Sequence, residues 1–307
     1  MTVIQVRVSA NKKLLNLDVK QNTVNIAMHA IRQIVRKARR TTSLLALVGK
    51  NAIAHANKNP VFILGNQKSG TSAICSLLGF ATGLSVSNDL RREIGKQYYL
   101  RLVNDGVPFS KLVSRNRLDF SRDIIKEPNL ALFFNELKNY FPLARFAIVI
   151  RDPRDNIRSI LNRVNVPGNL ESLGKSGNYR IDPGFELVLG DYFPAIRSGN
   201  HYIEQLAERW NYFFDVYSNN KEHLVLIRYE DFNKDKPRAI AGLAEALGLE
   251  QKYDISDKVD IQFQSRGNRT ISWQDFFGDE NLLRIEKTCY TRMASLGYTP
   301  ALYRSTR

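Results

Sequence analysis

The chain reads PVFILGNQKSGTSAICSLL over residues 60–78. This segment begins with an apolar run of strand length, Val61 to Leu64, and passes through a turn of small and polar residues, 65–72. From Ala73 onward, apolar residues recur at helical spacing. A strand, a glycine-bearing turn and a helix form a phosphate cradle, because backbone N–H groups of the turn and the positive end of the helix dipole converge. The segment therefore predicts a site for an anion with several oxygens.

The turn differs from the common G-x-x-x-x-G-K-[ST] loop of nucleotide-binding proteins. Gly65 and Gly70 have the spacing of that motif, but Thr71 and Ser72 follow the second glycine. The lysine, Lys68, stands before that glycine. We interpret the turn as a phosphate-binding loop whose cation is placed differently. The alternative is an ordinary strand-to-helix turn with a solvated lysine.

The composition is that of a globular protein with a sizeable core. The 307 residues can form one large α/β domain or two small ones, and 43% of them are hydrophobic. Two cysteines, Cys75 and Cys289, are too few for a disulfide framework and suit a reducing compartment, so we expect a cytoplasmic protein. No signal-peptide pattern opens the chain, and no apolar run is long enough for a transmembrane segment.

Positive charge is concentrated near the start of the chain. The net charge is +15, and residues 1–58 contain eleven lysines and arginines against one acid, Asp18. We expect residues 1–58 to be a basic, partly helical N-terminal extension and residues 59–307 to be the main domain. A basic arm can contact an anionic partner such as nucleic acid, lipid or an acidic glycan, or it can simply be a solvated surface.

Apolar segments of strand length alternate with segments of helical periodicity along the main domain. Further strands are expected at 123–125, 145–150 and 223–227, and helices at 88–103, 130–140, 154–163, 201–219, 239–247 and 281–296. Connections are expected at 80–87 and 262–279, a helix at 22–56, and weak strand signals occur in 1–22. The alternation predicts a three-layer, doubly wound α/β fold around a central parallel sheet.

Polar clusters follow the predicted strands. Besides the turn at 65–72, they are Lys126-Glu127, residues 151–155 and residues 228–231. Ligands of such folds bind at the carboxyl ends of the strands, so the clusters should share one edge of the sheet. They bring together cations and a hydroxyl that predict a polyanionic ligand: Lys68, Lys126, Arg151, Arg154 and Ser159. The spacing of eight residues from Arg151 to Ser159 would let a guanidinium and a hydroxyl clamp one phosphate. The alternative is that Arg151 pairs with Asp152 or Asp155.

Two motifs resemble signatures of sulfotransferases that use 3′-phosphoadenosine 5′-phosphosulfate (PAPS). GNQKSGTS, residues 65–72, is similar to the family's 5′-phosphosulfate loop, and VIRDPRDNIRS, residues 149–159, is similar to its 3′-phosphate motif. Lys126-x-Pro128, RYEDF at 228–232 and the last helical segment also resemble parts of these enzymes, so the resemblance covers about residues 59–300. It implies transfer of a sulfuryl group to a hydroxyl or amine, with 3′,5′-adenosine bisphosphate as the product.

The resemblance also implies roles for individual residues. Within the loop that Gly65 opens, Lys68 would contact the bridging and sulfuryl oxygens. The residues that would hold the 5′-phosphate are Ser69, Gly70, Thr71 and Ser72. Arg151 and Ser159 would bind the 3′-phosphate, and Tyr229 would lie beside the adenine. A late pair, Arg266 and Gly267, resembles a basic-glycine pair that also reaches the 3′-phosphate in some members.

The chain departs from the cytosolic subfamily at two positions. Ala73 stands where that subfamily has a tryptophan, and Pro128 stands where it has the catalytic histidine. A base must still take the acceptor's proton, and other branches of the family use a carboxylate. The candidates, each of which could instead be a surface acid, are Asp89, Glu93 and Glu127. Lys68 and Lys126 would stabilise charge on the leaving phosphate, and because lysines take the place of Mg²⁺ we expect no metal.

Two other functions are compatible with parts of the sequence. A P-loop kinase or NTPase would use ATP and bind Mg²⁺ at Asp152, and a non-catalytic basic nucleic-acid-binding protein would use the N-terminal arm. The acceptor of a sulfotransferase is expected to be hydroxylated, either a carbohydrate or a small metabolite. Residues 166–200 and the aromatic side chains of 201–219 could line its pocket, although Trp210 and Phe213 could equally be core.

Overall fold

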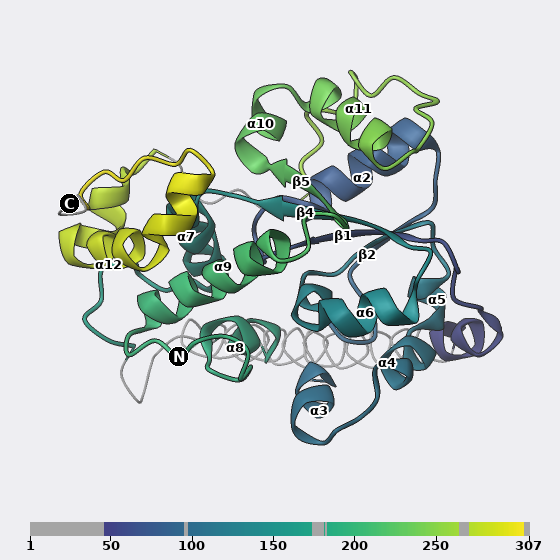
Figure 1. Cartoon of the computed structure of the whole chain (residues 1–307), viewed down its shortest axis with the longest axis horizontal. Helices are drawn as coiled ribbons and strands as arrows, with labels where there is room; N and C mark the ends of the chain where they lie inside the picture. The colour runs from purple at the N-terminus through teal and green to yellow at the C-terminus, as the bar shows by residue number, and fades with distance from the viewer. Residues whose placement is uncertain (1–45, 95–97, 174–180, 182, 264–269, 304–307) are drawn as a thin grey trace, which may run out of the picture. The chain divides into compact units, whose positions relative to one another are not determined.

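The computed structural model describes residues 46–94, 98–173, 181, 183–263 and 270–303 (Figure 1). The chain divides into two units, residues 1–54 and 55–307, and in the first of them residues 46–53 are helical. The elements predicted in residues 1–45, together with Arg266 and Gly267, lie outside the described residues. The boundary expected at residue 58 between an extension and a main domain stays a prediction.

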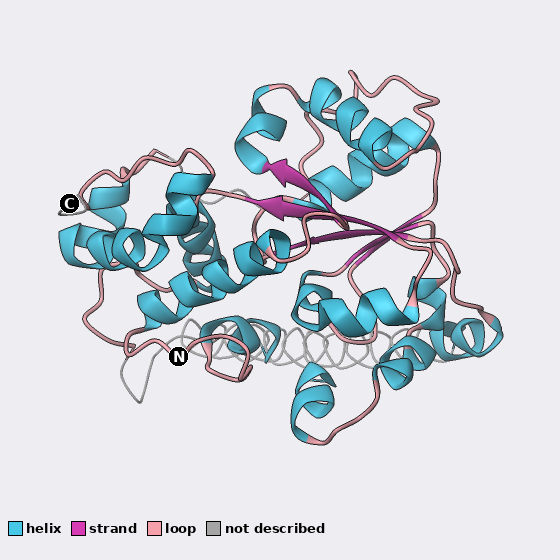
Figure 2. Ribbon diagram, in the orientation of Figure 1, coloured by secondary structure: helices cyan, strands magenta, loops and turns pink. Residues whose placement is uncertain are grey.

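Among the described residues, five parallel strands form one sheet in the second unit (Figure 2). Their order is β2-β3-β1-β4-β5, with the bounds β1 Val61–Gly65, β2 Val86–Asn88, β3 Ile124–Lys126, β4 Arg145–Ile150 and β5 Leu224–Arg228. Central β1 pairs Val61 with Ile124 of β3 and with Arg145 of β4. The chain builds one side of the sheet with β2 and β3 and then crosses to the other side for β4 and β5. Such a reversal opens a crevice at the carboxyl ends of the strands, here beyond Gly65.

Helices cover both faces of the sheet, which confirms the predicted three-layer α/β fold (Figure 1). On one face, α2 (Thr71–Thr82) and α11 (Lys236–Ala246) share an apolar cluster with Val61 and Ile63 of β1. On the other face, α6 (Phe134–Tyr140) packs in the cluster of Phe62 and Leu64. A third cluster joins α7 (Pro153–Val164), α9 (Tyr202–Ser218) and α12 (Trp273–Ser295). The shorter helices are α3 (Tyr98–Asn104), α4 (Phe109–Arg115), α5 (Arg117–Phe120), α8 (Pro183–Leu189) and α10 (Tyr229–Lys234).

The edge strand β2 and the turn after it differ from the prediction. α2 and β2 both extend into residues 80–87, so the plain connection expected there is wrong. β2 is held by pairing with β3, and after it Asp89 adopts a φ of 68°, outside the right-handed helical region. The helix predicted at 88–103 is therefore wrong up to residue 94, and α3 begins only at Tyr98.

The connection predicted at 262–279 is wrong in its second half. α12 begins at Trp273, because Ser272 Oγ accepts the backbone N–H of Asp275 at 3.0 Å and caps the helix. The other strands and helices predicted for the second unit are confirmed, with a 3₁₀ turn at Pro128–Phe133 ahead of α6.

Two further properties bear on the compartment and the membrane. Cys75 and Cys289 are buried free thiols. No helix among the described residues combines the length and the apolar character that crossing a bilayer requires.

Candidate active site

The loop after β1 has a backbone that excludes larger side chains at its two glycines. Gly65 has a φ of 140°, and a Cβ there would lie 2.6 Å from the carbonyl oxygen of Val149. Gly70 has a φ of 98° at the N-terminus of α2, and a Cβ there would lie 2.4 Å from the Tyr229 ring. Lys68 also has a positive φ, 65°, which L-residues rarely adopt. The chain thus turns tightly ahead of α2, as the predicted phosphate cradle requires.

Helix α7, which follows the neighbouring strand β4, holds this loop through side-chain hydrogen bonds. Asn156 donates from Nδ2 to the Gln67 carbonyl oxygen at 2.8 Å and to Ser69 Oγ at 3.1 Å. Its Oδ1 accepts from Asn66 Nδ2 at 2.9 Å. The predicted loop hydroxyls Ser69, Thr71 and Ser72 are all buried. Sequence reasoning missed Asn156, which only its place on the loop-facing side of α7 identifies.

Lys68 lies among other cations. Burial, followed by the positive charges of Arg163, Arg151 and Lys126, lowers the pKa of Lys68 to about 8. The structure therefore brings together three of the cations that the sequence placed at this edge and adds Arg163. Like charges gathered in this way repel one another, and an anion bound between them would offset that repulsion.

Arg151 follows β4 directly and is held against the loop. Its Nη1 donates to the Lys68 carbonyl oxygen at 3.1 Å, and its guanidinium lies 4.6 Å from the centre of the Tyr229 ring. Asp155 Oδ2 is 3.8 Å from Nη2, a long ion pair that partly realises the alternative considered for this arginine. Trp210 Nε1 donates to the Arg151 carbonyl oxygen at 2.8 Å and fixes the backbone. Arg151 and Tyr229 thus both lie against the loop.

Ser159 and Arg163 lie on the side of α7 that faces the loop. Ser159 is partly exposed and stands three residues after loop-bonded Asn156 and four after Asp155, so the three residues share one helical face. Arg163 stands one further turn along the same face, and its charge acts on Lys68. The sequence analysis missed Arg163, although its spacing of four residues from Ser159 is a signal that could have found it.

Lys126 and Asp89 form an ion pair where β3 and β2 end. Lys126 Nζ lies 2.5 Å from Asp89 Oδ1, and the Lys126 carbonyl oxygen accepts the Asp89 N–H at 2.7 Å. The lysine side chain is 4% exposed, whereas that of the aspartate is 36% exposed. Asp89 therefore presents a carboxylate to solvent at the edge of the sheet, beside a buried ammonium group whose charge reaches Lys68.

The other two candidate bases are placed differently. Glu127 is buried, and its two carboxylate oxygens accept the N–H groups of Leu90 at 3.2 Å and Asn129 at 3.0 Å. Burial and the negative charge of Asp89 raise the pKa of Glu127 to about 7, against the lowering effect of Lys126. Glu93 is also buried, but its carboxylate accepts a hydrogen bond from Arg115 Nε at 2.7 Å. The structure thus brings Glu127 next to the pair of Asp89 and Lys126 and leaves Glu93 outside it.

Arg154 and Asp152 form an ion pair in the interior of the fold. The prediction that Arg154 joins the ligand-facing cations is therefore wrong. Arg154 Nη2 lies 2.6 Å from Asp152 Oδ2, and its Nη1 lies 2.8 Å from Glu286 Oε1 of α12. Asp152 Oδ1 accepts both the backbone N–H and Nε of Arg154 at 2.9 Å. Both oxygens of Asp152 are therefore engaged. Among the described residues, no cluster of three His, Cys, Asp or Glu side chains has the arrangement of a metal site.

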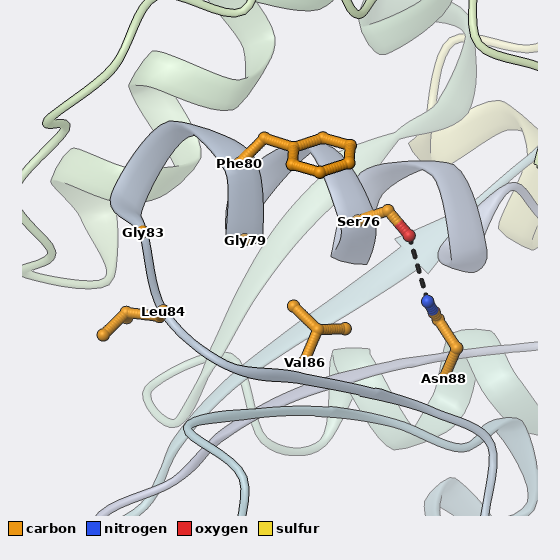
Figure 3. A pocket seen from close by; sticks show the side chains of 7 residues that line it. All are labelled: Ser76, Gly79, Phe80, Gly83, Leu84, Val86 and Asn88. Atoms are coloured by element: carbon orange, nitrogen blue, oxygen red, sulfur yellow. Dashed lines mark hydrogen bonds between the residues drawn. The ribbon is translucent and has the colours of Figure 1, made fainter.

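A pocket lies along α2 and the edge strand β2 (Figure 3). Its lining residues are Ser76, Gly79, Phe80, Gly83, Leu84, Val86 and Asn88. At one end, Asn88 Nδ2 donates to Ser76 Oγ at 3.0 Å. The pocket is lined by no charged side chain, so it differs in chemistry from the cationic loop.

The fold is similar to those of solved sulfotransferases. The sulfotransferase from Alicyclobacillus acidocaldarius matches with a TM-score of 0.40 and 14% identity, over 76% of this chain and 97% of that one. STF9 from Mycobacterium avium matches with a TM-score of 0.48 and 10% identity, over 78% of this chain and 77% of that one. Mouse SULT7A1, solved in complex with PAP, matches with a TM-score of 0.41 and 12% identity, over 81% of this chain and 89% of that one.

Comparisons at the level of sequence add nothing to this likeness. No protein-family model matches the chain, and no curated protein does. The likeness is one of fold, and what this protein binds depends on the residues of its own site.

Proposed function

We propose that the protein is a PAPS-dependent sulfotransferase, which moves the sulfuryl group of PAPS to a hydroxyl or amine of an acceptor. The observation that carries the proposal is the placement of two cations at one loop, Lys68 within it and Arg151 bonded to the Lys68 carbonyl oxygen. Lys68 lies within the loop ahead of α2, and Arg151 lies across from it against Tyr229. A nucleotide with anionic groups at both its 5′ and its 3′ positions matches this arrangement, because each anion meets its own cation.

The residues present fit such a nucleotide. The backbone of 69–72, the N-terminus of α2 and Lys68 would hold the 5′-phosphosulfate. Arg151, together with Ser159 and Arg163 on the facing side of α7, would bind the 3′-phosphate. Two assignments stay predictions from the resemblance: Tyr229 beside the adenine, and Arg266 with Gly267 at the 3′-phosphate.

Asp89 is the carboxylate that we assign as the base. It is the most exposed of the three candidates, and Lys126 holds it at the sheet edge next to the loop. Asp89 would accept the proton of the acceptor's hydroxyl as that oxygen bonds to sulfur. The bond between sulfur and the 5′-phosphate oxygen breaks, its electron pair stays on the phosphate, and Lys68 and Lys126 would stabilise that charge.

Glu127 would have a supporting part in this arrangement. Its carboxylate accepts the N–H of Leu90, which follows Asp89 directly, and so fixes the turn that carries the base. Its other oxygen caps the 3₁₀ turn through Asn129. Glu127 is therefore a positioning residue in this proposal, and its raised pKa reflects burial beside Asp89.

The acceptor is expected to be a carbohydrate or another hydroxylated metabolite, which stays a prediction. Trp210 and Phe213 of α9 are each 2% exposed and belong to the core, so they do not line its pocket. A cytoplasmic location and activity without a metal likewise stay predictions. A kinase or NTPase is less well supported, because the carboxylate that would bind Mg²⁺, Asp152, is engaged on both oxygens by Arg154.

The test is ligand-dependent stability of the purified full chain. We expect 3′,5′-adenosine bisphosphate, at 100 to 1,000 times its Kd, to stabilise the protein by about 3–4 kcal/mol. ATP with Mg²⁺ and 5′-AMP should stabilise it far less. Arg151→Ala should remove most of the shift. Arg145→Ala is the matched control: Arg145 lies at the other end of β4 and bonds the carbonyl oxygens of Leu247 and Gly248.

The outcomes separate the candidate functions. Transfer of label from PAPS to an acceptor, lost in Asp89→Asn while bisphosphate binding persists, would establish the reaction and the base. A preference for ATP with Mg²⁺, or an equal effect of Arg151→Ala and Arg145→Ala on bisphosphate binding, would overturn the proposal.

A further inference from the structure

Arg209 is a buried cation to which the proposed reaction assigns no role. It lies in the middle of α9 and is 1% exposed, among apolar side chains such as Leu206 and Phe213 that belong to the core. Its guanidinium lies 5.2 Å from the centre of the Phe213 ring. A charged group at such a position costs stability unless it is compensated, so its partners reveal what it is for.

Those partners are neutral amides on the two segments that carry the site lysines. Arg209 Nε donates to Asn66 Oδ1 at 3.1 Å, and its Nη2 donates to Gln67 Oε1 at 2.8 Å. The same Nη2 lies 3.4 Å from Asn129 Oδ1, which also accepts from Gln67 Nε2 at 2.8 Å. The amides of 66 and 67 directly precede Lys68, and Asn129 stands three residues after Lys126. Arg209 therefore joins the loop to the end of β3.

The charge of Arg209 is not balanced by any described carboxylate. In the part of the chain that the structure describes, no carboxylate lies within ion-pair distance of its guanidinium, and its hydrogen bonds go to amide oxygens. Arg154 shows the contrast, because it is equally buried but is held by the carboxylates of Asp152 and Glu286. Burial lowers the pKa of the Arg209 guanidinium, as expected for a cation without a counter-charge.

We propose that Arg209 is a positioning residue for the 5′ end of the donor: it fixes Lys68 relative to Lys126 through three amides, and its buried charge is neutralised when a 5′-anion occupies the loop. This inference rests on the proposed function and adds a source of selectivity. The site should favour nucleotides in proportion to the negative charge at the 5′ position. The 3′ end, which Arg151 serves, should depend less on Arg209 than the 5′ end does.

The experiment compares two nucleotides that differ only in the 5′ group. Isothermal titration of the full chain with 3′,5′-adenosine bisphosphate and with adenosine 3′-phosphate gives a Kd for each. In Arg209→Gln, we expect the Kd of the bisphosphate to rise roughly 10- to 30-fold, because one cation that attracts the 5′-anion through an effective dielectric constant of about 20 is removed. The Kd of adenosine 3′-phosphate should rise by a smaller factor, because the anion at the 5′ position is missing. Arg209→Lys keeps the charge and should recover part of the loss.

A matched control removes a cation of another helix that pairs with α9 and does not contact the loop. Arg292 of α12 pairs with Asp215 of α9 at 2.7 Å, so Arg292→Gln removes a cation packed on α9 at a distance from the amides. It should leave the ratio of the two Kd values at its wild-type level. If Arg209→Gln does not fold, Gln67→Ala breaks the link at 2.8 Å while the arginine stays, and a selective loss of about threefold is expected.

Each outcome has one meaning. Equal weakening of both nucleotides in Arg209→Gln, or lower stability with both Kd values unchanged, would show a purely structural role and overturn the inference. Failure of the wild-type protein to bind the bisphosphate at all would instead overturn the proposed function.

Discussion

Replacing Gly70 by alanine should damage the loop for two physical reasons whose costs can be separated. The φ of 98° at Gly70 is unfavourable for any L-residue, by about 1–2 kcal/mol. A Cβ would also lie 2.4 Å from Cδ2 and 2.5 Å from Cε2 of Tyr229, closer than non-bonded carbons approach. A shift of the ring would disturb its contact with the Arg151 guanidinium, 4.6 Å from its centre, a cation–π attraction of roughly 0.5–1 kcal/mol. We expect Gly70→Ala to lower the free energy of unfolding by about 2–3 kcal/mol.

Two further variants divide this cost. Gly106 has a φ of 60°, and nothing lies within 4 Å of a Cβ built on it, so Gly106→Ala carries the backbone cost alone, about 1 kcal/mol. Tyr229→Ala introduced into the Gly70→Ala protein removes the collision and leaves the backbone cost. The two substitutions at the loop should therefore be less than additive, with a coupling energy on the order of 1 kcal/mol.

The assay is urea unfolding followed by circular dichroism, with a parallel titration of 3′,5′-adenosine bisphosphate. Because Gly70 is the N-cap of α2 and Arg151 leans on the same ring, Gly70→Ala should also weaken bisphosphate binding by tenfold or more, on the order of the cost above. Gly106→Ala should not affect binding. If Gly70→Ala unfolds like Gly106→Ala and binds the bisphosphate like the wild type, the close approach of Tyr229 to the loop is not a feature of the working site.

Three further predictions concern titration and the base. Since Lys68 has a pKa of about 8 and binds anions only when protonated, bisphosphate affinity should fall as the pH rises through about 8, and Lys68→Arg should flatten that profile. Asp89→Asn should reduce turnover by about 10²–10⁴-fold with bisphosphate affinity retained, whereas Glu93→Gln should change only the melting temperature. The pKa of Glu127 is raised from an ordinary 4.5 to about 7, so its contribution to stability is full below about pH 4.5 and is lost as the pH rises through 7. In Glu127→Gln that loss, about 3 kcal/mol, should vanish from the pH dependence of urea unfolding.

The strands that meet at the loop could be predicted because their sequences are unambiguous. β1 and β4 are continuous apolar runs buried on both faces, and β1 is followed by a glycine turn whose spacing points to phosphate. Their carboxyl ends had to lie at the same edge of any parallel sheet. Lys68 and Arg151 could therefore be assigned to one edge, and the pairing of β1 with β4 brings them into contact.

β2 could not be predicted, because its three residues, Val-Ser-Asn, form a strand only by pairing with β3. The position of Asp89 depends on that pairing and on its positive φ, neither of which the sequence states. Arg154 and Arg151 follow the same strand and look alike in sequence. What separates them is Glu286, 132 residues further along, which reaches Arg154 through the packing of α12.

The buried cations of this fold differ in whether described carboxylates neutralise their charge. Arg154 is held between two carboxylates, so the fold retains its charge without help from a ligand. Arg209 of α9 is buried and Lys68 is half-buried, and the Arg209 guanidinium is held by amide oxygens of the loop that carries Lys68. Holding such charges together costs folding energy, and a bound polyanion recovers that energy as affinity. Under the proposed function, ligand binding and stability are therefore linked at this loop, because a doubly anionic nucleotide would offset its excess of positive charge.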